Sequence, residues 1–304
     1  MRKVKLCAVQ MAISPNSEEN IRKASEYVRK AHQDGANVIL LSELFLTPYF
    51  CQKENYDFFD LAIENIKETE FYKTFSNLAR ELEVVIPLSF FEKSGVAYYN
   101  SIIVIDADGS DLGVYRKTHI PTGECYEEKF YFTPGDTGFK VFNTKYLKLG
   151  IGICWDQWFP ETARCLTLMG AEALLFPTAI GSEPVLPIDS KCHWQNTMCG
   201  HAAANIIPVV ASNRVGKETI MDSSMTFYGS SFIANEEGSK VCELNREEEG
   251  YIIYEFDIDA LNKKRVSWGV FRDRRPNMYE AINYQSYIKS VSYTHLTLPT
   301  KLEV

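Results

Sequence analysis

Three side chains that together could carry out acyl transfer each stand at the end of an apolar, strand-like run. Glu43 lies in ILLSELFLTPYF, Lys117 in GVYRKTHIP and Cys154 in GIGICWDQWFPE. If each run is a strand, the three side chains can meet along one sheet edge. Pro160 favours the start of a helix soon after Cys154. A thiol at such a strand-to-helix elbow lies beside free backbone N–H groups that can stabilise a thiolate or an oxyanion.

These three residue types are sufficient for hydrolysis through a covalent intermediate. Glu43 could take the proton of the thiol and return it to a leaving nitrogen. Lys117 could place its ammonium on the tetrahedral oxyanion, together with the backbone N–H that follows Cys154. Loss of one such donor typically slows a reaction on the order of 10²–10³-fold. The scheme needs no histidine.

Each of the three residues also has an ordinary structural explanation. A cysteine in an apolar strand is more often a core residue than a nucleophile. A glutamate at a strand end is usually solvated, and a lysine that follows Arg116 is usually a surface charge. From type and spacing alone, the catalytic and structural interpretations have about equal support.

The elements that must position these residues alternate along the whole chain. Strand-like runs are VKLCAVQ, NVILLSE, VVIPLSF, NSIIVIDADG, LGVYRK, LKLGIGIC, EALLFPT, IIPVVAS, SSFIAN and YIIYEFDI. Helices are predicted to begin at the cap residues Ser17 and Thr69, at Pro160 and near Asp189. The alternation, without a linker or repeat, predicts one α/β domain. Strands that are apolar throughout indicate sheets covered on both faces.

Composition excludes several classes of protein. The 304 residues include 32 Lys and Arg against 40 Asp and Glu, a formal net charge of −8. A nucleic-acid binder usually has a basic excess, so no nucleic-acid partner is expected, and the acidic balance favours a cationic small molecule. No apolar run is long enough to span a bilayer. The N-terminal MRKVK leads straight into a strand rather than a signal peptide, so we expect a cytoplasmic protein with reduced cysteines and no membrane partner.

The segments SELF, YRKTHIP and GICWDQWFPE, in this order, make the chain similar to the nitrilase superfamily of carbon–nitrogen hydrolases. The resemblance runs from about Val4 to about Ala281. It implies that Glu43 is the general base, Lys117 the oxyanion stabiliser and Cys154 the nucleophile. It also implies that Glu128, in YEEKFYFTPGD, is a second glutamate that positions the substrate.

The same resemblance implies a four-layer αββα sandwich and a homo-oligomer of two or more subunits. We expect the hydrolase domain to span residues 1–290. Residues 291–304 are expected to be a non-native tail, because VSYTHLTLPT resembles the in-frame translation of a sequencing adapter. A genuine polar tail is the alternative, and His295 is left out of the site on this ground.

A longer segment, IGSEPVLPIDSKCHWQNTMCGHAAANIIPVVASNRVGKE, resembles the branch of the superfamily that acts on N-carbamoylputrescine. This implies hydrolysis of a cationic ureido substrate to putrescine, carbon dioxide and ammonia, a step of polyamine biosynthesis, through a thioester on Cys154. No organic cofactor is expected, since no phosphate loop or dinucleotide fingerprint occurs. The Cys and His residues between 192 and 201 match no zinc spacing, so no metal is expected either.

Acidic and aromatic residues near the nucleophile are candidates for binding this substrate. For the distal ammonium we expect Asp156 and Glu183, with Asp189 third. Tryptophans are expected to line the methylene chain or to contact the ammonium through a π face, and these are Trp155, Trp158 and Trp194. Each has a structural alternative: Asp189 is a natural helix cap, Glu183 suits a solvated loop and large aromatic residues are ordinary in a core.

Two other functions stay open at this level. The first is the same chemistry on another substrate, by an ω-amidase, an aliphatic amidase or a β-ureidopropionase-like carbamoylase. Acidity at Asp156 and Glu183 argues against anionic substrates but leaves neutral amides possible. The second is a nitrilase-like interaction protein without catalysis, against which the presence of Glu43, Lys117, Cys154 and Glu128 argues.

Overall fold

The computed structural model describes residues 1–182 and 189–286. The chain divides into two units, Met1–Lys264 and a second that begins at Arg265. The candidate site lies in the first unit. The candidate Glu183 and the expected tail, residues 291–304, lie outside the described residues. Within the described residues, no helix combines the length and hydropathy needed to cross a bilayer.

The first half of the chain supplies one sheet and two long helices. Its elements are β1 (Lys3–Gln10), α1 (Ser17–Gln33), β2 (Val38–Leu40), α2 (Glu70–Leu82), β3 (Ile86–Ser94), β4 (Ala97–Ile105), β5 (Asp111–Arg116) and the short α3 (Glu128–Tyr131). β1 pairs in parallel with β2 and antiparallel with β15 (Gly250–Asp257). A bridge between Val38 and Val85 connects this group to the β3-β4-β5 meander.

The second half supplies a six-stranded sheet of order β14-β13-β10-β8-β7-β6. Its elements are β6 (Val141–Asn143), β7 (Lys148–Ile151), α4 (Pro160–Leu168), β8 (Ala173–Thr178), α5 (Lys191–Asn205), β10 (Val209–Asn213), β13 (Phe232–Ala234) and β14 (Lys240–Glu243), and α6 (Ile258–Trp268) follows β15. A small separate sheet has the order β11-β12-β9 and consists of β9 (Gly181–Ser182), β11 (Val215–Ile220) and β12 (Ser223–Tyr228).

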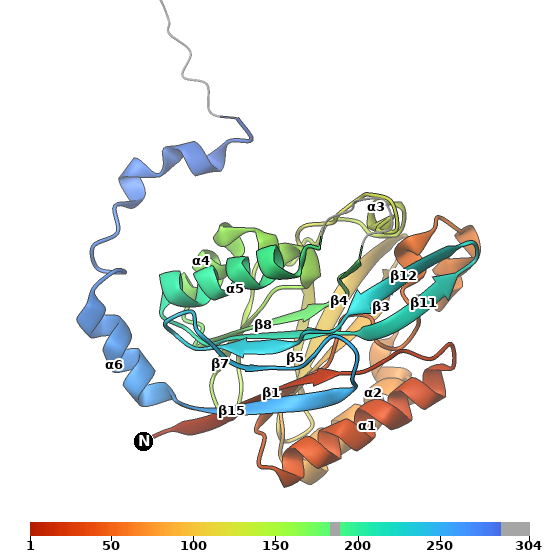
Figure 1. Ribbon diagram of the computed structural model, residues 1–304, viewed down its shortest axis with the longest axis horizontal. Coiled ribbons are helices and arrows are strands. Elements are labelled where there is room, and N and C mark those ends of the chain that lie inside the picture. Colours follow the sequence, from red (N-terminus) through yellow and green to blue (C-terminus); the bar gives the residue numbers. More distant parts are fainter. Residues whose placement is uncertain (183–188, 287–304) are drawn as a thin grey trace, which may run out of the picture. The chain divides into compact units, whose positions relative to one another are not determined.

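Side-chain alternation along the strands builds three apolar layers between four layers of structure. In β1, Leu6 and Ala8 face the other sheet, whereas Cys7 and Val9 face α1 and α2. In β8, Leu175 joins the layer between the sheets and Phe176 packs under α4 and α5. Figure 1 shows the two helix pairs on opposite sides of the paired sheets. The αββα sandwich expected from the resemblance is confirmed.

Local chemistry explains where several elements begin. Thr69 caps α2 as predicted, and its hydroxyl accepts a hydrogen bond from the Tyr72 N–H at 3.1 Å. α1 is capped by Asn16 rather than Ser17, because the Asn16 side chain reaches the N–H groups of both Glu18 and Glu19. The predicted β4–β5 hairpin turns at Asp108-Gly109, where Gly109 has a φ of +82°.

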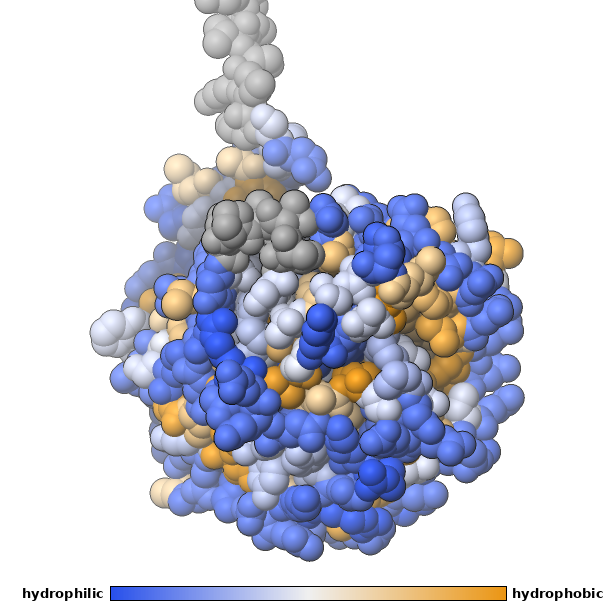
Figure 2. All heavy atoms as spheres, turned by 45° about the vertical axis from the view of Figure 1, so that its right-hand side comes forward, coloured by the Kyte–Doolittle hydropathy of each residue, from blue (hydrophilic) through white to orange (hydrophobic). Residues whose placement is uncertain are grey.

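Two further features of the first unit bear on the site. β2 ends at Leu40 because its pairing with β1 stops there, so Glu43 lies in the loop after the strand rather than at its end. The face shown in Figure 2 is mostly hydrophilic, with groups of hydrophobic residues between the hydrophilic ones.

Candidate active site

The four residues expected to carry the chemistry come from four separate segments and are all buried. Glu43 lies in the loop after β2, Lys117 directly follows β5, and Glu128 is the first residue of α3. Cys154 begins a single 3₁₀ turn, Cys154–Trp158, that links β7 to α4. Glu43, Lys117 and Glu128 are 0% exposed and Cys154 is 6% exposed.

Lys117 connects the two glutamates. Its Nζ donates to Oε1 of Glu43 at 2.9 Å and to Oε2 of Glu128 at 2.6 Å. Burial by itself lowers the pKa of Lys117, but the negative charges of Glu128 and Glu43 outweigh it and hold that pKa well above its ordinary value. Lys117 is therefore a permanent cation at physiological pH.

The two carboxylates differ in how many of their oxygens are occupied. Glu128 uses both, since Tyr49 Oη also donates to its Oε1 at 2.7 Å. Glu43 uses Oε1 for Lys117 and for Asn100 Nδ2, which donates at 2.7 Å. Its Oε2 is buried and has no hydrogen-bond partner among the described residues. Glu43 thus has an oxygen available to accept a proton, whereas Glu128 is held in place on both sides.

The nucleophile candidate sits on a strained turn. Cys154 has a φ of +42°, in the left-handed region that non-glycine residues seldom adopt. Burial raises the pKa of its thiol well above the ordinary value, and the nearby Glu43 adds to this while Lys117 opposes it. The resting thiol is therefore neutral. It requires a base to become a nucleophile.

Asp156 does not have the role that the sequence analysis gave it. The side chain is 0% exposed. Its carboxylate accepts hydrogen bonds from Ile153 N at 2.9 Å, Tyr115 Oη at 2.7 Å, His119 N at 3.0 Å and His119 Nδ1 at 2.7 Å. With these donors on both oxygens, Asp156 cannot also bind a substrate cation. It ties the turn that carries Cys154 to the segment that carries Lys117.

Two more of the predicted binding residues are not among the described residues that line the cavity, although Asp189 directly precedes the lining residue Ser190. Trp194, on α5, is fully buried in the core, and its Nε1 donates to Gln157 Oε1 at 2.7 Å. Asp189 accepts from the Lys191 N–H at 3.0 Å and pairs with Arg246. The structural alternatives to binding therefore describe both residues better. Trp155 and Trp158, in contrast, do line the cavity.

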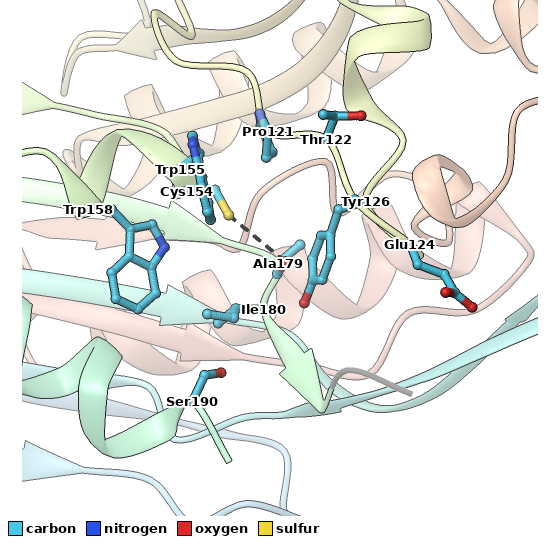
Figure 3. Close-up of a pocket in the computed structure, with 11 residues that line it drawn as sticks. Pro121, Thr122, Glu124, Tyr126, Cys154, Trp155, Trp158, Ala179, Ile180 and Ser190 are labelled. Carbon is cyan, nitrogen blue, oxygen red and sulfur yellow. Dashed lines mark hydrogen bonds between the residues drawn. The ribbon is translucent and has the colours of Figure 1, made fainter. Parts of the chain in front are cut away.

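A cavity of about 310 Å³ opens directly above the thiol. Figure 3 shows Trp155 and Trp158 on one side of Cys154 and Tyr126 on the other, with Ser190 at the far end. Its described lining consists mainly of apolar or uncharged residues and contains Pro121, Thr122, Gly123, Glu124, Tyr126, Cys154, Trp155, Trp158, Ala179, Ile180 and Ser190. Glu124 is the single charged residue among them, and its carboxylate is turned away from Cys154 in Figure 3.

Sequence reasoning missed several residues that complete the site. Tyr126 is the first residue of YEEKFYFTPGD, the segment that the resemblance had already marked, and Glu124 lies two residues before it. That proximity was the available indication that the segment lines the cavity. Tyr49 and Asn100 bind the two glutamates, but they lie far from Glu128 and Glu43 in sequence, so no local pattern predicts the contacts.

Comparisons with known proteins agree with this geometry. The carbon-nitrogen hydrolase family model matches residues 5–265. The chain is 53% identical over 286 residues to the N-carbamoylputrescine amidase of Arabidopsis thaliana, covering 92% of this chain and 95% of that protein. It is 52% identical over 283 residues to the citrullinase of Francisella tularensis, covering 93% and 99%. A carbon-nitrogen hydrolase structure from Helicobacter pylori superimposes with a TM-score of 0.88 at 36% identity, covering 94% of this chain and 100% of that one.

Proposed function

Because this chain belongs to the carbon-nitrogen hydrolase family, we propose that it hydrolyses the ureido group of N-carbamoylputrescine to putrescine, carbon dioxide and ammonia. The observation that carries the proposal is the buried Glu43–Lys117–Glu128 cluster beside Cys154, at the base of a cavity whose described lining contains no cationic residue. The choice of N-carbamoylputrescine as the substrate is supported by the similarity to plant relatives named N-carbamoylputrescine amidase, such as the Arabidopsis protein above.

The geometry suits a two-step mechanism. Glu43 Oε2 takes the thiol proton as Cys154 Sγ attacks the carbamoyl carbon. An ammonium has three donors, and Lys117 uses two of them for the glutamates, so one is left for the oxyanion beside the backbone N–H of Trp155. Collapse breaks the C–N bond, and the leaving nitrogen takes the proton back from Glu43. Water activated by Glu43 then cleaves the thioester, and the carbamate product loses carbon dioxide.

The cavity supports a substrate without a carboxylate. None of its described lining residues is lysine, arginine or histidine. A carboxylate moved into this site would lose hydration without gaining a cationic partner among these lining residues. A methylene chain can pack on Trp158 and Ile180, and Glu124 at the exposed rim supplies a negative charge for the ammonium.

Citrulline is the second candidate substrate, and one observation favours it. Asp189, next to the lining residue Ser190, is paired with Arg246. An ion pair of this kind complements the ammonium and carboxylate of an α-amino acid. The 52% identity to a citrullinase gives this alternative similar support from sequence.

Ammonia release from four substrates distinguishes these possibilities. Wild-type protein and Cys154→Ala are assayed with N-carbamoylputrescine, citrulline, N-carbamoyl-β-alanine and glutamine. Turnover of N-carbamoylputrescine at the highest kcat/KM, lost in Cys154→Ala, is the expected result. A preference for citrulline would transfer the proposal to the zwitterion. Turnover of the last two alone would refute the argument from the absence of cationic residues in the described cavity lining.

We also propose that the chain works as a cytoplasmic homo-oligomer. Large apolar side chains of the second unit are exposed, including Val266, Trp268, Met278 and Ile282. Surfaces of this kind commonly mark association sites. Sedimentation velocity of the purified protein would give a monomer mass if the proposal is wrong.

A further inference from the structure

A second buried ion pair, Arg214–Glu218, contacts the loop that carries Glu43. Arg214, between β10 and β11, is 0% exposed, and Glu218 on β11 is 4% exposed. The Nη1 of Arg214 lies 2.9 Å from each carboxylate oxygen of Glu218. The guanidinium also packs over the rings of Phe227 and Tyr49, at 5.2 Å and 5.8 Å from their centroids. Neither residue is among the described residues that line the cavity.

Arg214 binds the backbone at the general base and at the residue that follows it. Its Nη2 donates to the carbonyl oxygens of Glu43, at 2.7 Å, and Leu44, at 3.0 Å. Leu44 has a φ of +48°, so the chain is strained directly after Glu43. One rigid guanidinium bound to two successive carbonyls fixes the direction in which the Glu43 side chain leaves the loop.

Glu218 reaches the other glutamate through Tyr49. Its Oε2 accepts from the Tyr49 N–H at 2.6 Å, and the hydroxyl of the same tyrosine donates to Glu128 Oε1 at 2.7 Å. The Arg214–Glu218 pair therefore contacts the backbone of Glu43 directly and reaches Glu128 through Tyr49. Within the described chain, every hydrogen bond from these two side chains to residues outside the pair ends in the loop 43–49.

We propose that Arg214 and Glu218 are positioning residues that set Glu43 and Glu128 at their places around Lys117. Stability alone is a poor explanation, since a buried ion pair often contributes no more than apolar residues of similar volume. A positioning role explains better why the hydrogen bonds of both side chains to residues outside the pair end in the loop 43–49. If the pair acts by orienting Glu43, its effect must depend on the Glu43 carboxylate.

A double-mutant cycle tests this dependence without any substrate. The rate of Cys154 alkylation by iodoacetamide, followed by peptide mass spectrometry, reports how readily the thiol loses its proton. Arg214→Lys keeps the positive charge but removes the planar guanidinium that donates to the carbonyl oxygens of Glu43 and Leu44. It is measured alone and in a Glu43→Gln background. We expect about a tenfold slower alkylation in the first case and less than about a twofold change in the second.

Controls separate positioning from general loss of structure. Glu172→Gln removes a buried carboxylate that binds Arg2, Asn262 and the Lys148 N–H, in a separate network of contacts. It should lower the melting temperature and leave the alkylation rate unchanged. If Arg214→Lys does not fold, the neutral pair Arg214→Met with Glu218→Gln replaces it, because removal of both charges leaves no unpaired ion.

Failure of the positioning inference can be distinguished from failure of the proposed function. The same fold-change in both backgrounds would overturn the inference, as would an alkylation rate that follows the melting temperature across all variants. The inference rests on the proposed function only for the roles of Glu43 and Cys154. If Glu43→Gln itself leaves alkylation unchanged, the proposed roles fail rather than the positioning.

Discussion

Asp156 and Glu43 are both fully buried near Cys154, but their carboxylates differ in how many hydrogen bonds they accept. Asp156 accepts four hydrogen bonds, from Ile153, Tyr115 and both the backbone and the ring of His119. Glu43 accepts two, both on Oε1, and Oε2 has no partner among the described residues. The saturated carboxylate can only hold structure, whereas the one with a free oxygen can take a proton. Hydrogen-bond occupancy therefore distinguishes them where burial does not.

The largest expected effect on activity comes from removing Lys117, the cation that binds Glu43. Lys117→Gln takes away an oxyanion donor, so kcat for the ureido substrate should fall on the order of 10²–10³-fold. Lys3→Gln, which breaks an exposed pair with Glu255, is the matched control and should leave kcat unchanged. Steady-state ammonia release measures both variants. A loss of less than tenfold in Lys117→Gln would remove it from the oxyanion site.

The saturated carboxylate should matter for stability. Asp156→Asn places an amide against the donors that now converge on the carboxylate, and we expect a loss of about 2–4 kcal/mol in the free energy of unfolding. Asp106→Asn, where a less buried carboxylate accepts from Ala107 N and Lys145 N, should lose less. Urea denaturation followed by circular dichroism compares the two. Equal stability of wild type and Asp156→Asn would contradict the structural role.

The thiol beside Glu43 should make stability fall at high pH. Burial raises the pKa of the Cys154 thiol in the folded state well above that of an exposed thiol. Above pH 9 the unfolded chain releases this proton while the folded chain keeps it, so stability falls as pH rises, by at most about 1.4 kcal/mol per pH unit for this group. Cys154→Ala should flatten the slope and the exposed Cys192→Ala should not. Identical slopes in all three proteins between pH 9 and 10.5 would show that the thiol is not buried.

The smallest effect is expected from Glu124, whose carboxylate is exposed, unlike the buried carboxylates of Asp156 and Glu43. Glu124 lies at the rim of the cavity in contact with solvent. An exposed ion pair contributes little, so Glu124→Gln should raise KM for N-carbamoylputrescine about threefold and leave kcat unchanged. The exposed Glu237→Gln should change neither. An unchanged KM in Glu124→Gln would exclude Glu124 from the recognition of the ammonium.

The sequence predicted much of this arrangement, because local chemistry determined it. The Thr69 cap, the turn at Asp108-Gly109 and the start of α4 at Pro160 follow from the preferences of single residues. The three motifs marked Glu43, Lys117 and Cys154. Their contacts in the structure join segments that the motifs alone could not place relative to each other.

The errors concern contacts between distant segments. Asp156 follows the nucleophile by two residues, but its donors include Tyr115, near the end of β5, and His119, which follows that strand. The hairpin of β11 and β12 was not predicted. Its two-residue turn is Met221-Asp222, and Met221, with a φ of +55°, is not a residue type that usually adopts this conformation. That hairpin carries Glu218, so sequence reasoning could not find the positioning pair.

The most direct test of the central claim compares Glu43→Gln with Asp156→Asn in one assay. Ammonia release from N-carbamoylputrescine is measured for each variant and divided by its folded fraction from circular dichroism. We predict that Glu43→Gln is folded and about 10³-fold slower than wild type, whereas Asp156→Asn, per folded molecule, stays within about tenfold of wild type. A folded Glu43→Gln protein that turns over within tenfold of wild type would contradict the assignment of the general base.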